Sequence, residues 1–197
     1  MAAIYARSTS AELAKMFGEP ELLRGYGRRN TTLMAIAPTK SSSFILGQVS
    51  QSIEAEFSNC YVKDLAKTKV TIRNPHLQQV LEAHGKDDRD TWRSIRDMDG
   101  SVQHLEFLTD HERDVFKTFA EIDPNVIVDL AGVRQQYIDQ SQSLNLMLDP
   151  STSVKDINAL YLRAWEKGVK SLYYSFSMSK AQSLTRKKLV ECESCAL

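Results

Sequence analysis

The segment GVKSLYYSF, residues 168–176, has the composition of a buried strand. Gly168 ends the preceding helix, and a run rich in aromatic and apolar residues follows it. Tyr173 and Tyr174 lie near the end of this run. Because neighbouring side chains of a strand point to opposite faces, one hydroxyl is expected to face inward and the other outward, an arrangement suited to moving an electron and a proton through a sheet. The alternative is that both tyrosines are core aromatics whose hydroxyls hydrogen-bond locally.

The elements before this segment follow from helix and strand patterns. Ser153 is predicted to begin the helix that leads into it, and Asp123-Pro124 to begin the one before. Asn74-Pro75 predicts an earlier helix start, and the Thr109/Glu112 pair predicts a capping box. Thr9 and Glu12 have the same spacing ahead of a short helix that Gly18 would end. Short strands are predicted at 61–62 and 69–72. The apolar residues at helical spacing, expected on buried faces, are Val126, Ile127, Leu130, Val133 and Tyr137, and further along Val154, Ile157, Tyr161, Ala164 and Trp165.

A second buried strand is predicted at Thr32–Ala37, and small hydroxyl residues follow it. Thr39, Lys40, Ser41 and Ser42 lie there, ahead of a helix expected over residues 44–46. Free backbone N–H groups and the positive end of a helix favour an anion, so this turn is a candidate phosphate site. It lacks the Gly-rich spacing of a P-loop. The alternative is that these serines only cap the helix.

The last stretch of the chain, 178–197, is polar and basic and has no periodic apolar face. It carries Cys192 and Cys195, whose spacing suits a small-ring disulfide that exchanges with another dithiol. A mobile arm carrying such a pair could move between two stations. Half of a zinc site and a chance pair of cysteines are the alternatives.

The bulk composition excludes several classes of function. Lys+Arg and Asp+Glu both number 25, and no basic stripe indicates nucleic acid or a membrane surface. No spanning helix and no signal peptide are expected, which favours the cytoplasm. The four histidines, expected at the surface or in caps, show no metal-ligand spacing: His76, His84, His104 and His111. No hydrolase motif is present.

Five segments combine into a more specific pattern. They are Gly27–Leu33 (GRRNTTL), Ala37–Ser42 (APTKSS), Tyr137–Asn145 (YIDQSQSLN), Ala164–Tyr174 (AWEKGVKSLYY) and the Cys192/Cys195 pair. In order and spacing they resemble the C-terminal part of the large subunit of class I ribonucleotide reductase, of the phage type. The resemblance covers nearly the whole chain. It implies an α/β fold, namely the C-terminal part of that family's ten-stranded α/β barrel at 1–177, followed by a flexible redox tail at 178–197.

The resemblance also implies roles for the matching residues. The loop Thr39–Ser42 would hold the diphosphate of a ribonucleoside diphosphate. Tyr173 and Tyr174 would be the last two tyrosines of a radical-transfer chain, Tyr173 nearer the active-site cysteine and Tyr174 nearer the subunit interface. Cys192 and Cys195 would reduce the active-site disulfide after each turnover and be reduced in turn by thioredoxin or glutaredoxin.

The resemblance is incomplete in one respect. The family's N-terminal domain, the first half of its barrel and the loop with the thiyl cysteine have no counterpart, and Cys60 does not lie in that loop's motif. We therefore expect a separate N-terminal piece of the large subunit as a partner, together with a small subunit that carries the metal-radical cofactor. No cofactor or metal is expected in this chain. The reaction would convert ribonucleoside diphosphates to 2'-deoxyribonucleoside diphosphates in the cytoplasm, that of the host if a phage encodes the chain. The alternatives are a non-catalytic remnant that only binds partners and a free-standing dithiol carrier.

Overall fold

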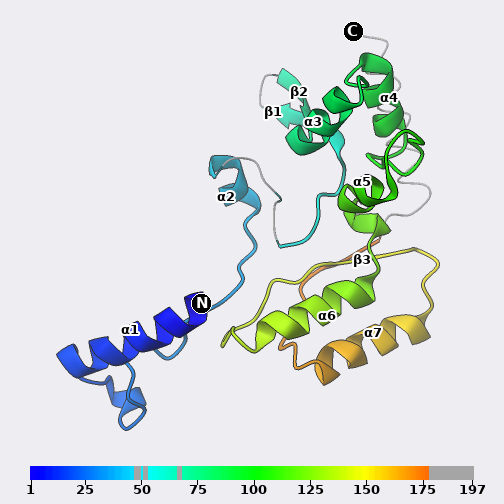
Figure 1. The fold of residues 1–197 in the computed structure, drawn as a ribbon. Coiled ribbons are helices and arrows are strands. Elements are labelled where there is room, and N and C mark those ends of the chain that lie inside the picture. The colour runs from blue at the N-terminus through cyan, green and yellow to red at the C-terminus, as the bar shows by residue number, and fades with distance from the viewer. Residues whose placement is uncertain (47–49, 51–52, 66–67, 178–197) are drawn as a thin grey trace. The chain divides into compact units, whose positions relative to one another are not determined.

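The computed structural model describes residues 1–46, 50, 53–65 and 68–177 (Figure 1). The chain divides into two compact units, each assembled from stretches that are separate in the sequence. The first unit comprises Met1–Ile53, Pro124–Leu146 and Thr152–Ser175. The second comprises Glu54–Asp123, Met147–Ser151 and, among the described residues after them, Phe176 and Ser177. The predicted tail at 178–197 lies outside the described residues.

Helices and short strands alternate along the described residues. In chain order they are α1 (Ala2–Phe17), a 3-10 turn (Glu21–Leu23), α2 (Lys40–Ile45), β1 (Cys60–Leu65), β2 (Thr68–Arg73), α3 (Pro75–Ala83), α4 (Arg89–Asp97), α5 (Asp110–Val115), a second 3-10 turn (Phe119–Glu121), α6 (Pro124–Gln135), β3 (Leu146–Leu148), α7 (Val154–Glu166) and β4 (Ser175–Ser177). β1 pairs with β2, and β3 pairs with β4.

In the first unit, α6 and α7 lie side by side (Figure 1). The Arg163 guanidinium donates two hydrogen bonds to the Asp129 carboxylate, at 2.9 and 2.6 Å. Gly132 lets the helices approach closely, since a Cβ at that position would lie 2.8 Å from the Cβ of Lys167. A missing side chain at Gly132 and the ion pairs of Asp129 with Arg163 and Lys167 therefore fit α6 against α7.

The buried strand predicted at Thr32–Ala37 is wrong in its extent and in its burial, since none of these residues is buried. The structure has an extended segment there with one isolated parallel bridge, between Ile36 and Gln142. The Ile36 N–H donates to the Ser141 carbonyl at 3.2 Å, and the Ser143 N–H donates to the Ile36 carbonyl at 2.8 Å. The segment is thus aligned with residues 141–143 without forming a full strand.

The buried strand predicted at 168–176 is also wrong in extent and in burial. Only Ser175–Ser177 form a strand, β4, and all three residues are exposed. Tyr173 and Tyr174 are 47% and 57% exposed. The apolar composition led to the expectation of a core position, but the described chain supplies nothing that covers this face.

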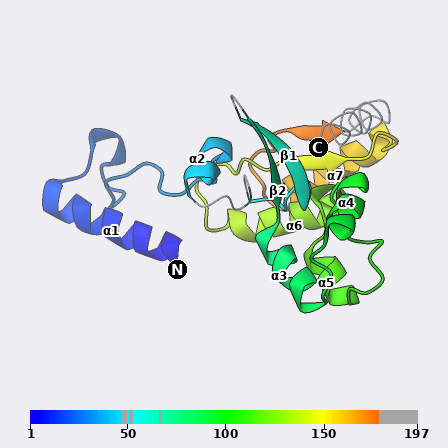
Figure 2. The ribbon, with the colours of Figure 1, turned by 90° about the horizontal axis from the view of Figure 1, so that it is seen from above.

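The second unit is built on the β1–β2 hairpin and the helices α3, α4 and α5 (Figure 2). β1 and β2 are antiparallel. Cys60 is paired with Arg73 at one end of the ladder, and Leu65 is paired with Thr68 at the other end. The strands predicted at 61–62 and 69–72 are confirmed within it. The buried apolar cluster of this unit consists of Cys60, Leu77, Leu81, Trp92, Ile95, Val102, Leu105, Leu108 and Phe116.

The helix starts predicted in the second unit are confirmed. The Asn74 side chain accepts hydrogen bonds from the first backbone N–H groups of α3, whose first residue is Pro75. Thr109 and Glu112 form the capping box of α5, with the Glu112 N–H donating to the Thr109 hydroxyl at 3.2 Å. These caps need only neighbouring residues, which is why the sequence pattern identifies them.

Two helix predictions in the first unit require correction. The short helix expected after Thr9 starts at Ala2, so Thr9 and Glu12 lie inside α1 and cap nothing, although Gly18 follows its end as predicted. On α6 the expected buried face is largely exposed, with Leu130 50% and Val133 61% accessible. The side chains buried on this helix are instead Val128, Ala131 and Gln135.

The predicted buried face of α7 is wrong in the same way. Ala164 is buried as expected, together with Leu160, which the prediction did not include. Val154, Tyr161 and Trp165 are 83%, 46% and 74% exposed. Both α6 and α7 therefore carry more apolar surface than the described chain covers.

Candidate functional site

The residues predicted to bind phosphate lie together at the start of α2. Thr39 immediately precedes the helix, and its carbonyl accepts the Ser43 N–H at 2.9 Å. Lys40, Ser41 and Ser42 form the first turn, so the helix begins earlier than the sequence pattern indicated. The first N–H groups of a helix have no partner within it, and here these residues carry them. The Ser42 side chain is exposed; the structure does not describe the side chains of Lys40 and Ser41.

Tyr173 and Tyr174 form a contacting pair. Their ring centroids are 4.2 Å apart, with an angle of 62° between the ring planes. The hydrogen bond to Tyr174 raises the pKa of Tyr173 above its ordinary value of 10.0. The expectation that the two hydroxyls face opposite sides of a sheet is wrong, because the chain is not a regular strand at these residues. Two phenols in hydrogen-bonding contact can exchange a proton directly.

One backbone segment, Asp139–Leu146, which we call the central segment, contacts the tyrosine pair. The Tyr173 N–H donates to the Leu144 carbonyl at 2.8 Å, and the Leu146 N–H donates to the Tyr174 carbonyl at 2.8 Å. The same segment pairs with Ile36, ahead of the Thr39–Ser42 loop. The central segment is therefore hydrogen-bonded both to the chain that enters the loop and to the backbone that carries the two phenols.

The Asp139 side chain anchors the chain that leads to the loop. Its carboxylate accepts the Leu33 N–H at 2.8 and 3.0 Å and the Met34 N–H at 2.8 Å. Burial would raise the pKa of Asp139, but the Met34 and Leu33 N–H groups, helped by the nearby Arg28 charge, lower it below 3.8. The carboxylate therefore stays ionised and continues to accept both N–H groups near neutral pH.

The three cysteines divide between the described and undescribed parts of the chain. Cys192 and Cys195 lie outside the described residues, so their predicted pairing stays a prediction. Cys60 is a free, buried thiol of the second unit. Burial raises the pKa of Cys60, and the charges of Arg73 and Arg96 offset this only in part. A protonated thiol packed among apolar side chains fits a core residue better than a nucleophile.

The histidines occupy exposed positions, as expected, and His84 is the C-cap residue that follows α3. In the part of the chain that the structure describes, no group of three or more His, Cys, Asp and Glu side chains is arranged to hold a metal ion. Among the same residues, no helix is both long and apolar enough to cross a bilayer.

The sequence pattern did not single out three polar residues of the first unit. Asp139 and Gln142 were noted only within the YIDQSQSLN segment, and Gln135 was not noted at all. Gln135 and Gln142 are 8% and 1% exposed. The only hint of these residues in the sequence is the cluster of amide and carboxylate side chains in the stretch YIDQSQSLN. The groups that they hydrogen-bond, such as the Leu33 and Met34 N–H groups, lie too far along the chain to be inferred from spacing.

Three comparisons with known proteins agree. The family described as "Ribonucleotide reductase, barrel domain" matches residues 5–175. The ribonucleoside-diphosphate reductase large subunit of Invertebrate iridescent virus 3 is 41% identical over 166 residues, covering 83% of this chain and 26% of that protein. The ribonucleoside-diphosphate reductase subunit alpha of Chlamydia muridarum is 41% identical over 158 residues, covering 80% of this chain and 15% of that protein. A solved structure, the Actinobacillus ureae class Id ribonucleotide reductase alpha subunit, matches with a TM-score of 0.81 and 54% identity, covering 90% of this chain and 32% of that one.

Proposed function

The chain belongs to the ribonucleotide reductase barrel-domain family, and on this premise we propose that it acts as the C-terminal part of the large subunit of a ribonucleoside-diphosphate reductase. Its α/β fold is that of the family's barrel, as the resemblance predicted. The chain spans 26% of the length of the iridescent virus relative and 32% of the solved alpha subunit. The activity would require the remaining, N-terminal part of the subunit.

In the proposed reaction a ribonucleoside diphosphate and a reduced dithiol give a 2'-deoxyribonucleoside diphosphate, water and a disulfide. The Thr39–Ser42 turn would hold the diphosphate through backbone N–H groups and hydroxyls. Cys192 and Cys195 would reduce the active-site disulfide that each turnover leaves, and would themselves form a disulfide. The dithiol of thioredoxin or glutaredoxin would then reduce that disulfide.

The tyrosine pair would relay the oxidising equivalent. The small subunit would hold the metal-radical cofactor that supplies it, and no residue of this chain is assigned to that cofactor. Tyr174 would lose an electron and a proton first, and Tyr173 would then pass a hydrogen atom's equivalent to Tyr174 and oxidise the active-site cysteine of the N-terminal part. Short contacts matter for this transfer, because a proton moves only over hydrogen-bonding distance.

The observation that supports this assignment most is the tyrosine pair itself. The two rings lie 4.2 Å apart, and the backbone that carries them is bonded to the central segment, which also pairs with the chain entering the phosphate turn. Proton transfer between Tyr173 and Tyr174 needs no rearrangement in this geometry.

The test is reconstitution of the full chain with the N-terminal part of the subunit, the small subunit, thioredoxin and a ribonucleoside diphosphate. Tyr173→Phe and Tyr174→Phe keep the ring but remove the hydroxyl, so both should abolish formation of the deoxyribonucleotide. Tyr26→Phe, a matched change at a residue 70% exposed in the same unit, should leave the rate unchanged.

Two outcomes would contradict the proposal. Wild-type rates in either of the two variants would remove the tyrosines from the reaction. An assembled wild-type complex without any reductase activity would instead favour the non-catalytic remnant. Assembly is checked independently by size-exclusion chromatography.

A further inference from the structure

The proposed function leaves two buried glutamine side chains unused. Gln135, at the end of α6, and Gln142, in the central segment, are 8% and 1% exposed. The Gln142 amide Nε2 donates to the Gln135 Oε1 at 3.0 Å. Burying an amide is costly unless its groups are hydrogen-bonded, so a buried pair of amides favours the single arrangement that satisfies both.

Gln142 fixes the central segment to α6. Its Nε2 donates a second hydrogen bond to the Ala131 carbonyl at 2.9 Å. Its Oε1 accepts the Arg134 Nε–H at 3.1 Å. Both Ala131 and Arg134 belong to α6, so this one side chain uses its two donors and an acceptor to set the position of residue 142 against the helix.

Gln135 extends the same network to the chain that leads to the tyrosines. Its Nε2 donates to the Ile138 carbonyl at 2.8 Å and to the Gln140 carbonyl at 2.9 Å. Its Oε1 accepts the Lys170 N–H at 3.4 Å, in addition to the Gln142 amide. Lys170 lies shortly before Tyr173. The amide pair therefore joins α6, the central segment and the stretch after α7.

We infer that Gln135 and Gln142 are positioning residues, whose paired amides hold the central segment in the one register that places both the Thr39–Ser42 turn and the Tyr173/Tyr174 pair. The inference rests on the proposed function, and it adds that one pair of residues positions two parts of that site, the phosphate turn and the tyrosine pair. The central segment has hydrogen bonds to Ile36 on one side and to the tyrosine backbone further along. A shift of this segment would therefore displace both stations together.

If Gln135 and Gln142 only filled space, their contacts would not need to be directional hydrogen bonds. The amide pair instead meets four backbone groups, the carbonyls of Ala131, Ile138 and Gln140 and the N–H of Lys170. Hydrogen bonds depend steeply on angle, so they specify register in a way that apolar packing does not. An apolar side chain of the same length should fill the volume and lose the register.

The first test is hydrogen exchange on the full chain, which needs no enzyme activity. Gln142→Met keeps the length of the side chain but loses every amide contact. Gln136→Met makes the same change at an exposed residue just after α6, whose amide donates to the Val133 carbonyl. In Gln142→Met the Leu146 and Tyr173 amides should exchange about tenfold faster, and in Gln136→Met about as in wild type.

Amides within α7 should keep their wild-type exchange rates in both variants. Unchanged exchange at Leu146 and Tyr173 in Gln142→Met would overturn the inference, as would an equal acceleration throughout the first unit. If Gln142→Met lacks the native circular dichroism spectrum, Gln142→Asn replaces it. The shorter amide cannot reach both Ala131 and Gln135, so the same two amides should exchange faster.

The second test separates positioning from simple loss of stability. In the reconstituted complex, Gln142→Met should raise KM for the ribonucleoside diphosphate and lower kcat, each by about tenfold, because both stations move. A lower yield of active protein with wild-type KM would show a structural role only and overturn the inference. Failure of the wild-type complex to react would count against the proposed function, whereas the exchange test would still decide the role of the glutamines.

Discussion

The two units of this chain are stabilised in different ways. The second unit surrounds a cluster of nine buried apolar residues and packs Phe57 edge-on against Phe119, with ring centroids 5.3 Å apart. The first unit buries polar side chains such as Gln135 and Gln142, while Leu130 and Trp165 are 50% and 74% exposed. The second unit thus has a contiguous apolar cluster, whereas in the first unit a buried amide pair joins the end of α6 to the central segment and large apolar side chains of α6 and α7 lie exposed.

The difference fits a chain that forms part of a larger barrel. Large apolar areas on a surface usually mark an interface, and α6 and α7 carry such areas in the first unit. The chain covers only 32% of the solved alpha subunit that it resembles, so most of that subunit has no counterpart in it. We therefore expect substitutions in the second unit to act through close packing, and those in the first to act mainly through helix contacts and polar register.

The largest effect is expected for Gly100→Ala in the second unit. Gly100 has φ +88°, and a Cβ there would lie 2.6 Å from the Ser58 Cα and 2.7 Å from the Asn59 nitrogen. Backbone atoms cannot yield as a flexible side chain can, so the unfolding free energy should fall by about 4 kcal/mol. Gly85→Ala is the matched control, because φ is +64° there but no atom lies within 4 Å. It should lose only about 1 kcal/mol.

Urea unfolding followed by fluorescence measures this difference. The chain has two tryptophans, and Trp165→Phe leaves Trp92, which is 2% exposed, as the reporter of the second unit. Equal losses in the Gly100 and Gly85 variants would mean that the tight packing at Gly100 is absent in solution.

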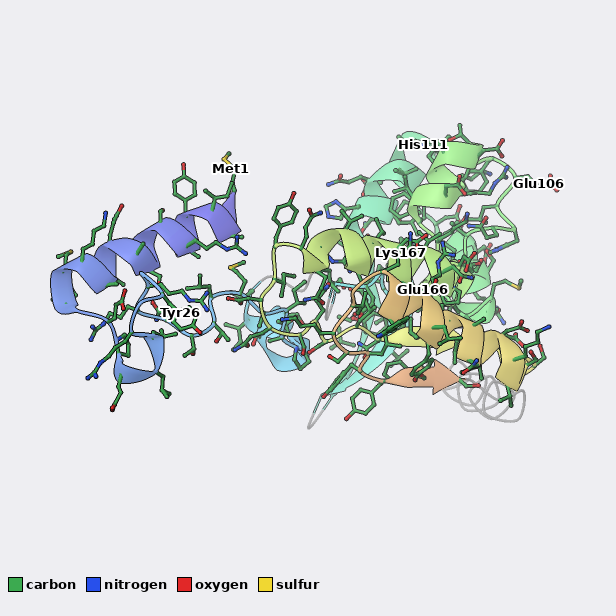
Figure 3. The ribbon with its side chains drawn as sticks, turned by 90° about the horizontal axis from the view of Figure 1, so that it is seen from below. Met1, Tyr26, Glu106, His111, Glu166 and Lys167 are labelled. Atoms are coloured by element: carbon green, nitrogen blue, oxygen red, sulfur yellow. The ribbon has the colours of Figure 1, made fainter. Side chains whose placement is uncertain are left out.

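A smaller effect of the same kind is expected for Gly132→Ala in the first unit. Helix propensity alone favours alanine over glycine by about 1 kcal/mol. The new Cβ would lie 2.8 Å from the Lys167 Cβ and 3.1 Å from the Lys167 carbonyl oxygen, where α6 meets the end of α7 (Figure 3). We expect this crowding to prevail, with a net loss of about 1–2 kcal/mol measured by thermal unfolding.

A companion variant sharpens this test. Lys167→Ala shortens the side chain but retains the Cβ and the carbonyl that obstruct the new methyl group, so it should not rescue Gly132→Ala. Stabilisation by Gly132→Ala would show that α6 and α7 separate easily. The first unit would then depend even more on its polar contacts than the structure indicates.

The same contrast explains which features the sequence could predict. Caps at Asn74 and Thr109 were predicted correctly, because each depends on residues within one helical turn. The hairpin strands in the second unit were also predicted, since their alternating residues pair with a neighbour in the chain. The resemblance identified the family, and the 54% identity to a solved alpha subunit confirms it.

The failures lie mostly in the first unit. Apolar residues such as Leu130, Val133 and Trp165 were assigned to buried faces, but burial depends on partners that the described chain does not contain. The contact between Tyr173 and Tyr174 arises because the backbone there is irregular, whereas a strand period was assumed. The pairing of Gln135 with Gln142 joins a helix end to an extended segment, and no local pattern encodes such a contact.

The smallest expected effect is a pH dependence confined to the second unit. The Thr109 N–H and hydroxyl, with His84 beside them, lower the pKa of Glu112 from 4.5 to about 2. Because the folded state holds the carboxylate ionised, the capping box contributes its full stability above pH 4.5 and loses it as the pH falls from 4.5 towards 2. Glu112→Gln should remove this part of the acid dependence. The acid dependence of stability is measured from urea unfolding midpoints, followed by Trp92 fluorescence, between pH 4.5 and about 2. Asp88 and Asp114 of the second unit also have lowered pKa values, through the Thr91 N–H and Lys117 respectively, so their acid sensitivity should remain in that variant. An identical pH profile before and after the substitution would mean that Glu112 titrates normally in the folded chain.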